Sequence, residues 1–312
     1  MKVVNNISEF TASKQSVITI GTFDGVHIGH RKIITDLVSI AKKNNLQSII
    51  LTFFPHPRTV LQKDSNMKMI DTLDEKKKIF EKLGLEILII QEFSVEFSRL
   101  TAIEFVRDIL VNKLNISRLI IGYDHRFGRN RESNVEDLKS FGVDFNFKVD
   151  QISSQNIESI AVSSTKIRNA ITQGKIKLAN KFLTRNFKMN GIVIEGNKLG
   201  RKIGFPTANL KIINNYKIRP KNGVYLVKSK FSEKILFGMM NVGFRPTILG
   251  KNIQIEIHFF SFNENLYGMS LSIELLEKIR EEKKFDSLDK LKNQLNKDSK
   301  KCQKLILQYI QH

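Results

Sequence analysis

The sequence predicts an α/β domain with a parallel sheet, followed by a small β-barrel that ends in a helix. The chain has 312 residues, which is more than one ordinary core accommodates. Short apolar runs alternate with helical patterns from residue 16 to about residue 183. After residue 185 the apolar runs are β-rich and are separated by Gly, Asn and Pro. We therefore expect two domains, residues 1–185 and residues 186–312.

In the first half, predicted strands alternate with predicted helices. The strands are expected at 17–22, 48–54, 86–90, 118–121 and 144–149. Helix starts are expected at two capping boxes, Thr101 with Glu104 and Ser133 with Glu136. Gly84 and Gly142 stand where helices should stop. This order is typical of a nucleotide-binding α/β fold.

The second half is predicted to be a barrel closed by one helix. Strands are expected at 191–195, 223–230, 235–242 and 253–261. Apolar residues recur near helical spacing between 287 and 310, so a terminal helix should pack on the barrel.

Composition restricts the class of protein. Apolar residues make up 41% and charged residues 26% of the chain, and the apolar runs fall short of a membrane span, so we expect a soluble protein. The single Cys302 and the absence of a secretory signal pattern fit the cytoplasm. The net charge of +20 comes mainly from Lys residues that are spread along the chain with acidic residues between them. This pattern favours a generally basic surface over a nucleic-acid groove, and the charge suits phosphorylated ligands. The sequence leaves homo-oligomer formation open.

The motif GTFDGVHIGH, residues 21–30, lies between a predicted strand and a predicted helix. The first amides of a helix are unpaired and its dipole is positive at that end, which favours an anion such as phosphate. Gly21, Gly25 and Gly29 allow a close approach, and His27 and His30 face the same way. The two imidazoles can stabilise charge as an α-phosphate is attacked. The alternatives are turn histidines or metal ligands, although no third metal ligand lies nearby.

A second phosphate-binding pattern stands at 163–168. Ser163 or Ser164 can cap a helix beginning near Thr165, and Arg168 adds a positive charge. The alternative is an ordinary helix start with a surface Arg.

A glycine-punctuated loop in the second half, residues 191–209, ends in Pro-Thr-Ala-Asn. Its glycines permit close approach to a phosphate tail, while Thr207 and Asn209 offer oxygen ligands suited to Mg²⁺. Without context, such a loop is equally a β-turn. Further on, alternation puts Gln254, Glu256 and His258 on one strand face. Glu256 is the candidate base for a hydroxyl proton, against the alternative of a solvated polar face, and we expect His258 to be structural.

Residues 21–30 resemble the ATP-binding signature of the HxGH nucleotidylyltransferase superfamily, in the form found in prokaryotic bifunctional riboflavin kinase/FAD synthetases. Residues 52–57, 122–129 and 163–168 resemble further segments of that family, except that His125 replaces a common aromatic. The resemblance implies a Rossmann-like domain that adenylylates FMN. It implies ATP contacts from Gly21, Phe23, Asp24, Gly25, His27, Gly29, His30, Ser163, Ser164, Thr165 and Arg168. It implies flavin-nucleotide contacts from Pro55, His56, Pro57, Asp124, Phe127 and Gly128.

Residues 191–209 resemble the flavokinase signature of the same family almost position for position. This resemblance implies a riboflavin kinase-like barrel in which Glu256 is catalytic and Thr207 and Asn209 hold Mg²⁺. It implies ATP contacts from Gly196, Gly200, Arg201, Gly204, Phe205, Pro206, Thr207 and Asn209. Asn241 and Arg280 are expected on the flavin side, with a helix-surface Arg as the alternative for Arg280.

The resemblance of these motifs to one family implies a bifunctional enzyme for small-molecule substrates. It would use ATP and Mg²⁺ to convert riboflavin to FMN, and a second ATP to convert FMN to FAD. One alternative keeps only the kinase, with a first domain turned into a binding module. The other is a basic nucleic-acid-binding protein, which leaves the ordered glycine and histidine motifs unexplained.

Overall fold

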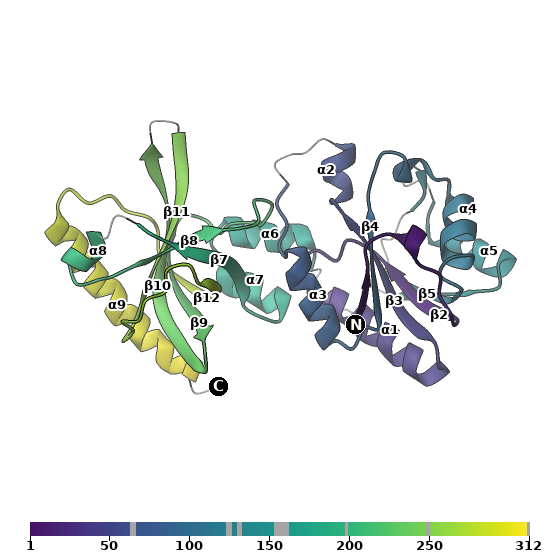
Figure 1. The fold of residues 1–312 in the computed structure, drawn as a ribbon, viewed down its shortest axis with the longest axis horizontal. Helices are drawn as coiled ribbons and strands as arrows, with labels where there is room; N and C mark the ends of the chain where they lie inside the picture. Colours follow the sequence, from purple (N-terminus) through teal and green to yellow (C-terminus); the bar gives the residue numbers. More distant parts are fainter. Residues whose placement is uncertain are drawn as a thin grey trace. The chain divides into compact units, whose positions relative to one another are not determined.

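The computed structural model describes residues 1–62, 67–122, 127–129, 133–152, 162–196, 199–247 and 250–310. The chain forms two compact units, Met1–Ser164 and Thr165–His312 (Figure 1). The helices α6 (Ser164–Thr172) and α7 (Ile176–Leu183) precede residue 185 but make their contacts mainly in the second unit. On α7, the Asn180 amide donates to the Leu275 carbonyl at 2.9 Å, which ties this helix to the barrel.

The first unit contains a six-stranded sheet in the order β1-β4-β3-β2-β5-β6, and every pair in it is parallel. The strands are β1 (Lys2–Val4), β2 (Ser16–Ile20), β3 (Gln47–Phe54), β4 (Ile87–Glu92), β5 (Ile116–Gly122) and β6 (Lys148–Ile152). Four of the five predicted strands are confirmed. The strand predicted at 144–149 is displaced, because a helix extends to Asp144.

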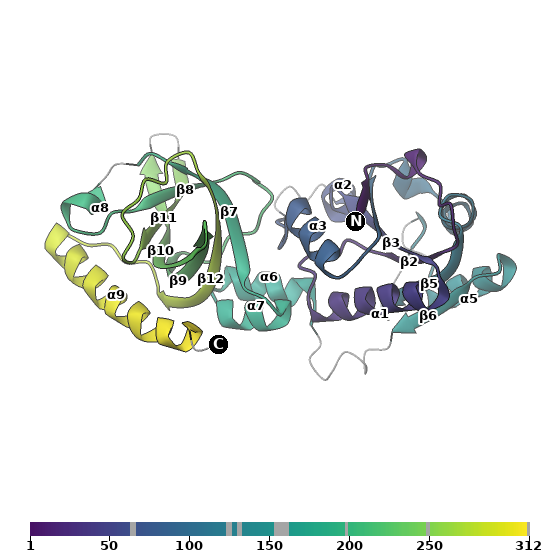
Figure 2. The same cartoon turned by 60° about the horizontal axis from the view of Figure 1, so that its bottom comes forward.

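Helices cover both faces of this sheet, as the α/β prediction requires (Figure 2). On one face, α1 (Ile28–Asn44) and α3 (Leu73–Lys82) contribute Leu37 and Phe80 to a core with Ile50 of β3. On the other face, the π-helix η3 (Phe105–Val111) and α5 (Val135–Asp144) pack against the alternate strand residues. Shorter segments complete the unit: η1 (Ile7–Glu9), α2 (Pro57–Leu61), η2 (Phe97–Arg99) and α4 (Ala102–Glu104).

The predicted helix ends are confirmed in two cases and wrong in two. Thr101 and Glu104 form the expected capping box, and Gly84 follows α3 with a φ of 82°. The box predicted at Ser133 lies one residue later, where Asn134 and Asp137 satisfy each other's backbone amides. Gly142 lies inside α5 and does not end it: the position a Cβ would take there is 2.6 Å from the Phe147 carbonyl oxygen, so close packing explains this glycine.

The second unit is a closed barrel in the order β10-β11-β8-β7-β12-β9, and all its pairs are antiparallel. Its strands are β7 (Phe187–Ile194), β8 (Ala208–Ile212), β9 (Gly223–Phe231), β10 (Lys234–Thr247), β11 (Gly250–Phe259) and β12 (Ser270–Arg280). β8 and β12 are not among the predicted strands. The short α8 (Leu199–Lys202) lies in the glycine-punctuated loop.

The terminal helix α9 (Leu288–Ile310) confirms the prediction for the end of the chain. Cys302 is fully buried between α9 and a barrel core that includes Leu226 and Leu276. Burial raises the pKa of the Cys302 thiol to about 12, so this cysteine is a structural apolar residue. Among the residues that the structure describes, no helix combines the length and hydropathy needed to cross a membrane.

Candidate active sites

The glycine and histidine motif follows β2 at the point where the strand order of the sheet reverses. The chain runs from β2 outward to β3 and β4 on one side, and β5 and β6 lie on the other. In open parallel sheets, ligands bind outside the carboxyl ends of the strands at such a switch point. The fold therefore places residues 21–30 at the expected nucleotide-binding position.

His27 and His30 lie together at the start of α1, as the sequence predicts. His27 is the N-cap of the helix, and its Nδ1 accepts a hydrogen bond from the His30 amide at 3.4 Å. The two imidazole rings stack with centroids 3.7 Å apart and planes inclined by 19°. The histidines thus form one unit beside the positive end of the helix dipole.

The surroundings of His30 disfavour a second positive charge. Burial, then His27, then Lys76 of α3 lower the pKa of His30 well below its usual value. Nδ1 of His30 is buried and has no hydrogen-bond partner among the described residues. A neutral imidazole at the N-terminus of a helix can donate one hydrogen bond to a phosphate oxygen.

Two residues that the motif assigns to ATP have buried side chains. Phe23 is 3% exposed and packs edge-on against Phe80 and His30. Asp24 is 1% exposed, and its carboxylate accepts hydrogen bonds from the amides of Ile70 and Asp71 at 2.9 and 3.3 Å. These side chains therefore help to hold the shape of the loop.

The predicted 163–168 segment starts α6 at Ser164, one residue before the expected start. The Ser164 hydroxyl donates to the Asp24 carbonyl at 2.8 Å, which links the two phosphate-binding patterns within the first unit. Thr165 and Arg168 lie on α6 within the second compact unit.

The predicted flavin-nucleotide residues leave the strands on either side of β2. Pro55, His56 and Pro57 follow β3; His56 caps α2 by accepting from the Arg58 amide at 3.2 Å, and the Phe54–Pro55 peptide is cis. The Phe127 ring is buried in the core, and Gly128, with a φ of 72°, packs against Ala102. Asp124 and His125 lie outside the described residues.

In the barrel, three polar residues form a row across neighbouring strands. Glu256 of β11 pairs with Asn209 of β8 on one side and with Asn241 of β10 on the other. Residues directly opposite each other in antiparallel strands project from the same face. The strand register therefore brings together the predicted base, a predicted Mg²⁺ ligand and a predicted flavin residue.

Gln254 joins two members of this row and was not among the predicted site residues. Its Nε2 donates to Oδ1 of Asn209 at 2.9 Å and to Oε1 of Glu256 at 2.8 Å. The alternation of β11 places Gln254 beside Glu256, but the link to β8 required the strand pairing. One amide thus fixes the orientation of both oxygen-bearing side chains.

The glycine-punctuated loop folds closely around Asn209 and Thr207. A Cβ at Gly196 would lie 2.0 Å from the Asn209 amide nitrogen, and one at Gly200 would lie 2.1 Å from the Phe205 carbonyl oxygen. Gly204 has a φ of 84°, and Arg201 is exposed on α8. Phe205 packs against the core cluster that contains Cys302 of α9. The close approaches explain these glycines.

Hydroxyl, amide and carboxylate oxygens are the ligands that Mg²⁺ prefers, so the chemistry of Thr207, Asn209 and Glu256 fits this ion. Among the described residues, no group of three or more His, Cys, Asp and Glu side chains could hold a metal ion.

The His258 Nδ1 lies 2.8 Å from the Pro206 carbonyl oxygen, and its ring packs on Phe205 and Phe260. Arg280 ends β12 and is therefore not on a helix surface. Its Nε donates to the buried Asp298 of α9 at 2.8 Å.

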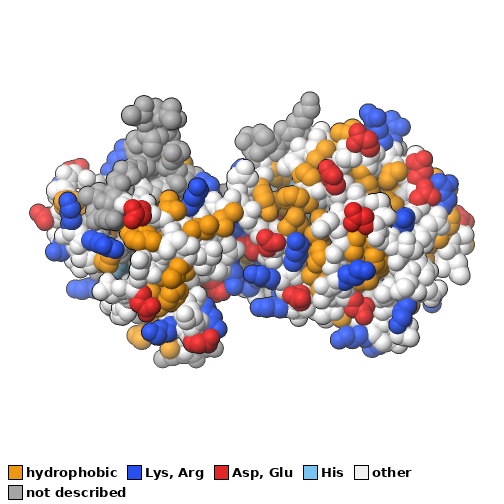
Figure 3. All heavy atoms as spheres, in the orientation of Figure 1, with side chains coloured by type: hydrophobic (Ala, Val, Ile, Leu, Met, Phe, Trp, Pro, Cys, Tyr) orange, Lys and Arg blue, Asp and Glu red, His pale blue; other side chains and the backbone are white. Residues whose placement is uncertain are grey.

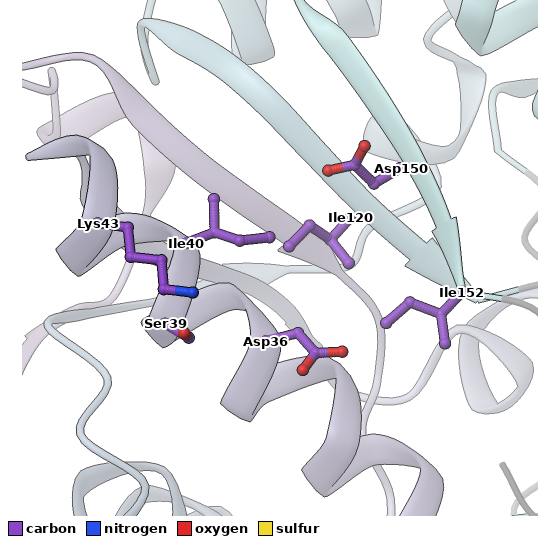
Figure 4. A pocket seen from close by; sticks show the side chains of 7 residues that line it. All are labelled: Asp36, Ser39, Ile40, Lys43, Ile120, Asp150 and Ile152. Carbon is purple, nitrogen blue, oxygen red and sulfur yellow. The ribbon is translucent and has the colours of Figure 1, made fainter. Parts of the chain in front are cut away.

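A surface pocket of about 360 Å³ lies between α1 and strands β5 and β6 (Figure 4). It is lined by Asp36, Ser39, Ile40, Lys43, Ile120, Asp150 and Ile152. None of these residues belongs to the predicted sites.

The FAD synthetase family matches residues 9–166, and the riboflavin kinase family matches residues 183–306. The bifunctional riboflavin kinase/FMN adenylyltransferase of Buchnera aphidicola subsp. Schizaphis graminum is 41% identical over 96% of each chain. The proteins of the same name from Escherichia coli K12 and Bacillus subtilis are 35% and 34% identical over 96% and 92% of each chain.

Among solved structures, the crystal structure of a macrolide-efflux protein from Streptococcus pneumoniae is similar to the whole chain. It has a TM-score of 0.87 and 32% identity, and covers 96% of this chain and 97% of its own. The histidine loop at the switch point, the polar row of the barrel and these similarities agree: the chain belongs to the family of bifunctional riboflavin kinase/FMN adenylyltransferases.

Proposed function

We propose that the two activities of this family occupy two separate sites in the chain, the adenylyltransferase within residues 1–185 and the kinase within residues 186–312. The kinase transfers the γ-phosphate of ATP to the 5′-hydroxyl of riboflavin and releases ADP. The adenylyltransferase lets the FMN phosphate attack the α-phosphate of ATP, forms FAD and releases pyrophosphate. The stacked pair His27 and His30 at the N-terminus of α1 is the observation that carries the proposal.

At the kinase site, Glu256 accepts the proton of the attacking hydroxyl. Gln254 holds this carboxylate by its hydrogen bond of 2.8 Å, so the base is oriented before substrate binds. Thr207 and Asn209 would hold Mg²⁺, and Asn241, next to Glu256 in the strand register, contacts the flavin. When bound, Mg²⁺ would neutralise charge on the ATP phosphates. Arg280 supports the flavin side of the kinase site because its hydrogen bond to Asp298 fixes α9.

At the adenylyltransferase site, no protein nucleophile is required, since the FMN phosphate attacks directly. His27 and His30 donate hydrogen bonds to oxygens of the α-phosphate, where negative charge increases in the transition state. The backbone amides from Gly21 to Gly29 and the residues Ser163 and Ser164 hold the outer phosphates. The FMN lies over the ends of β3 and β5, beside Pro55 to Pro57 and Gly128.

The proposal fits a cytoplasmic enzyme that acts on small molecules. On the face shown in Figure 3, Lys and Arg side chains are interspersed with Asp and Glu over the described residues. This mixture supports a generally basic surface and not a nucleic-acid groove.

Two substitutions test the assignment of the sites. His30→Ala should lower FAD formation from FMN by about 100-fold or more and leave riboflavin phosphorylation unchanged. Glu256→Gln should lower riboflavin phosphorylation by about 100-fold or more and leave FAD formation from FMN unchanged. Each reaction is measured separately by chromatography of the flavins. Equal loss of both reactions in either variant would show that the sites are not separate.

A further inference from the structure

A buried lysine contacts the histidine loop, residues 21–30, and has no role in the proposed chemistry. Lys76 of α3 is 2% exposed, and its Nζ donates to the Thr22 carbonyl at 3.0 Å. It occupies the same helix face as Phe80, four residues later, which is fully buried. Burying an ammonium costs several kcal/mol unless other groups compensate. An apolar residue would serve the packing of α3 at lower cost, so the charge itself requires an explanation.

Two buried carboxylates compensate this charge. Asp24 and Asp71 are 1% and 5% exposed, and both raise the pKa of Lys76 against the larger lowering effect of its burial. Asp24 belongs to the histidine loop, and Asp71 immediately precedes the N-cap of α3. Because Asp24 also accepts the amides of Ile70 and Asp71, the loop and the start of α3 are joined by charge and by hydrogen bonds.

The loop that Lys76 contacts is held in an unfavourable backbone conformation. Phe23 and Val26 have φ angles of 47° and 28°, a region that is unfavourable for residues other than glycine. Thr22, whose carbonyl Lys76 binds, directly precedes this strained segment, and His27 directly follows it. A contact that fixes the beginning of the segment also fixes the position of the histidines.

We propose that Lys76 is a positioning residue of the adenylyltransferase site. Its ammonium anchors the Thr22 carbonyl, fixes the loop that carries His27 and His30, and places positive charge beneath the region where the ATP phosphates bind. This inference rests on the proposed function of that loop. It also accounts for the direction of one electrostatic effect, since Lys76 is among the groups that lower the pKa of His30.

The charges around His30 define a readout that packing alone would not change. His27 and Lys76 lower its pKa, while Asp24 and Asp71 face Lys76 from the loop and from the segment before α3. Removing the Lys76 charge should therefore move the His30 titration midpoint upward, toward 6.5. A substitution with the same charge should leave the midpoint low.

The test compares Lys76→Met, which keeps the length and removes the charge, with Lys76→Arg, which keeps the charge. Lys78→Met, an exposed lysine on the same helix, is the matched control. Lys76→Met should lower kcat for FAD formation from FMN by at least about tenfold, and Lys76→Arg should retain more activity. Riboflavin phosphorylation by the same chains should stay unchanged. The NMR spectrum of labelled histidines shows whether the first unit is folded and gives the His30 midpoint.

A folded Lys76→Met variant with the rate and the His30 midpoint of the unsubstituted chain would overturn the proposal. If that variant does not fold, NMR of ¹⁵N-labelled lysine in the unsubstituted chain tests the proposal. The Lys76 ammonium resonance should shift on addition of a non-hydrolysable ATP analogue. An unchanged resonance at a saturating concentration of the analogue would refute the inference. Failure of the proposed function is distinguishable, because His30→Ala would then leave FAD formation intact.

Discussion

At the scale of single residues, the two sites share a design in which neighbouring groups orient the reactive side chains. In the first unit, the loop buries Nδ1 of His30 and stacks its ring on His27. In the barrel, Gln254 holds both Glu256 and Asn209. Preorganisation of this kind reduces the rearrangement needed at the transition state.

The lowered pKa of His30 predicts a specific acid sensitivity. Above pH 6.5 the imidazole is neutral in both the folded and the unfolded chain, so it does not affect stability. As the pH falls below 6.5, the unfolded chain takes up the proton and the folded chain does not, so the melting temperature should fall. His30→Gln should show a smaller fall between pH 7 and pH 5.

Circular dichroism at a series of pH values measures this difference. His258 also has a lowered pKa, mainly through burial, but it is present in both proteins and its effect cancels in the comparison. An equal fall in melting temperature for the two proteins between pH 7 and pH 5 would contradict the electrostatic description of His30.

The bridging amide of Gln254 predicts a kinase defect without loss of the base. Gln254→Met removes both hydrogen bonds and should lower kcat for riboflavin phosphorylation by about tenfold, because Glu256 and Asn209 lose their common orientation. FAD formation from FMN should not change. Gln303→Met, at an exposed position of α9, is the control. An unchanged phosphorylation rate would show that the substrate alone orients Glu256.

At the scale of elements, the sequence predicted most strands because buried strands appear as short apolar runs. The strands 17–22, 48–54 and 118–121 correspond to β2, β3 and β5. β8 was missed because its five residues include Asn209 and Lys211, and β12 because its charged residues interrupt the apolar pattern. Their places depend on barrel closure, which is a tertiary property.

Gly142 provides a test of tertiary packing against helix propensity. Alanine favours a helix over glycine by about 1 kcal/mol, so propensity alone predicts stabilisation. The position of the new Cβ, however, lies 2.6 Å from the Phe147 carbonyl oxygen and 3.4 Å from Cγ2 of Val149. Gly142→Ala should therefore lower the free energy of unfolding by about 1–3 kcal/mol.

Urea unfolding measures this change, with Ser140→Ala at an exposed position of the same helix as the control. A more stable Gly142→Ala protein would show that propensity outweighs the contact.

At the scale of the whole molecule, the sequence predicts the candidate reactive residues of each site, but not the residues that hold them. The sequence predicted His27, His30, Glu256, Thr207 and Asn209 because each stands in a local motif whose spacing has a physical meaning. It did not predict Lys76 or Gln254, because their partners Thr22 and Asn209 lie on other elements. Lys76 left one signal, a charged residue at an apolar position of an amphipathic helix.

The central claim is that the chain carries two independent ATP-dependent sites, one in each domain. Mixing two defective chains tests it most directly. Neither Glu256→Gln nor His30→Ala alone should form FAD from riboflavin and ATP, and His30→Ala should accumulate FMN. An equimolar mixture should form FAD, because FMN made by one chain is adenylylated by the other. If the mixture forms no FAD although Glu256→Gln converts added FMN, free passage of FMN between separate sites is contradicted. Loss of both reactions in either chain would contradict the claim that the two sites are independent.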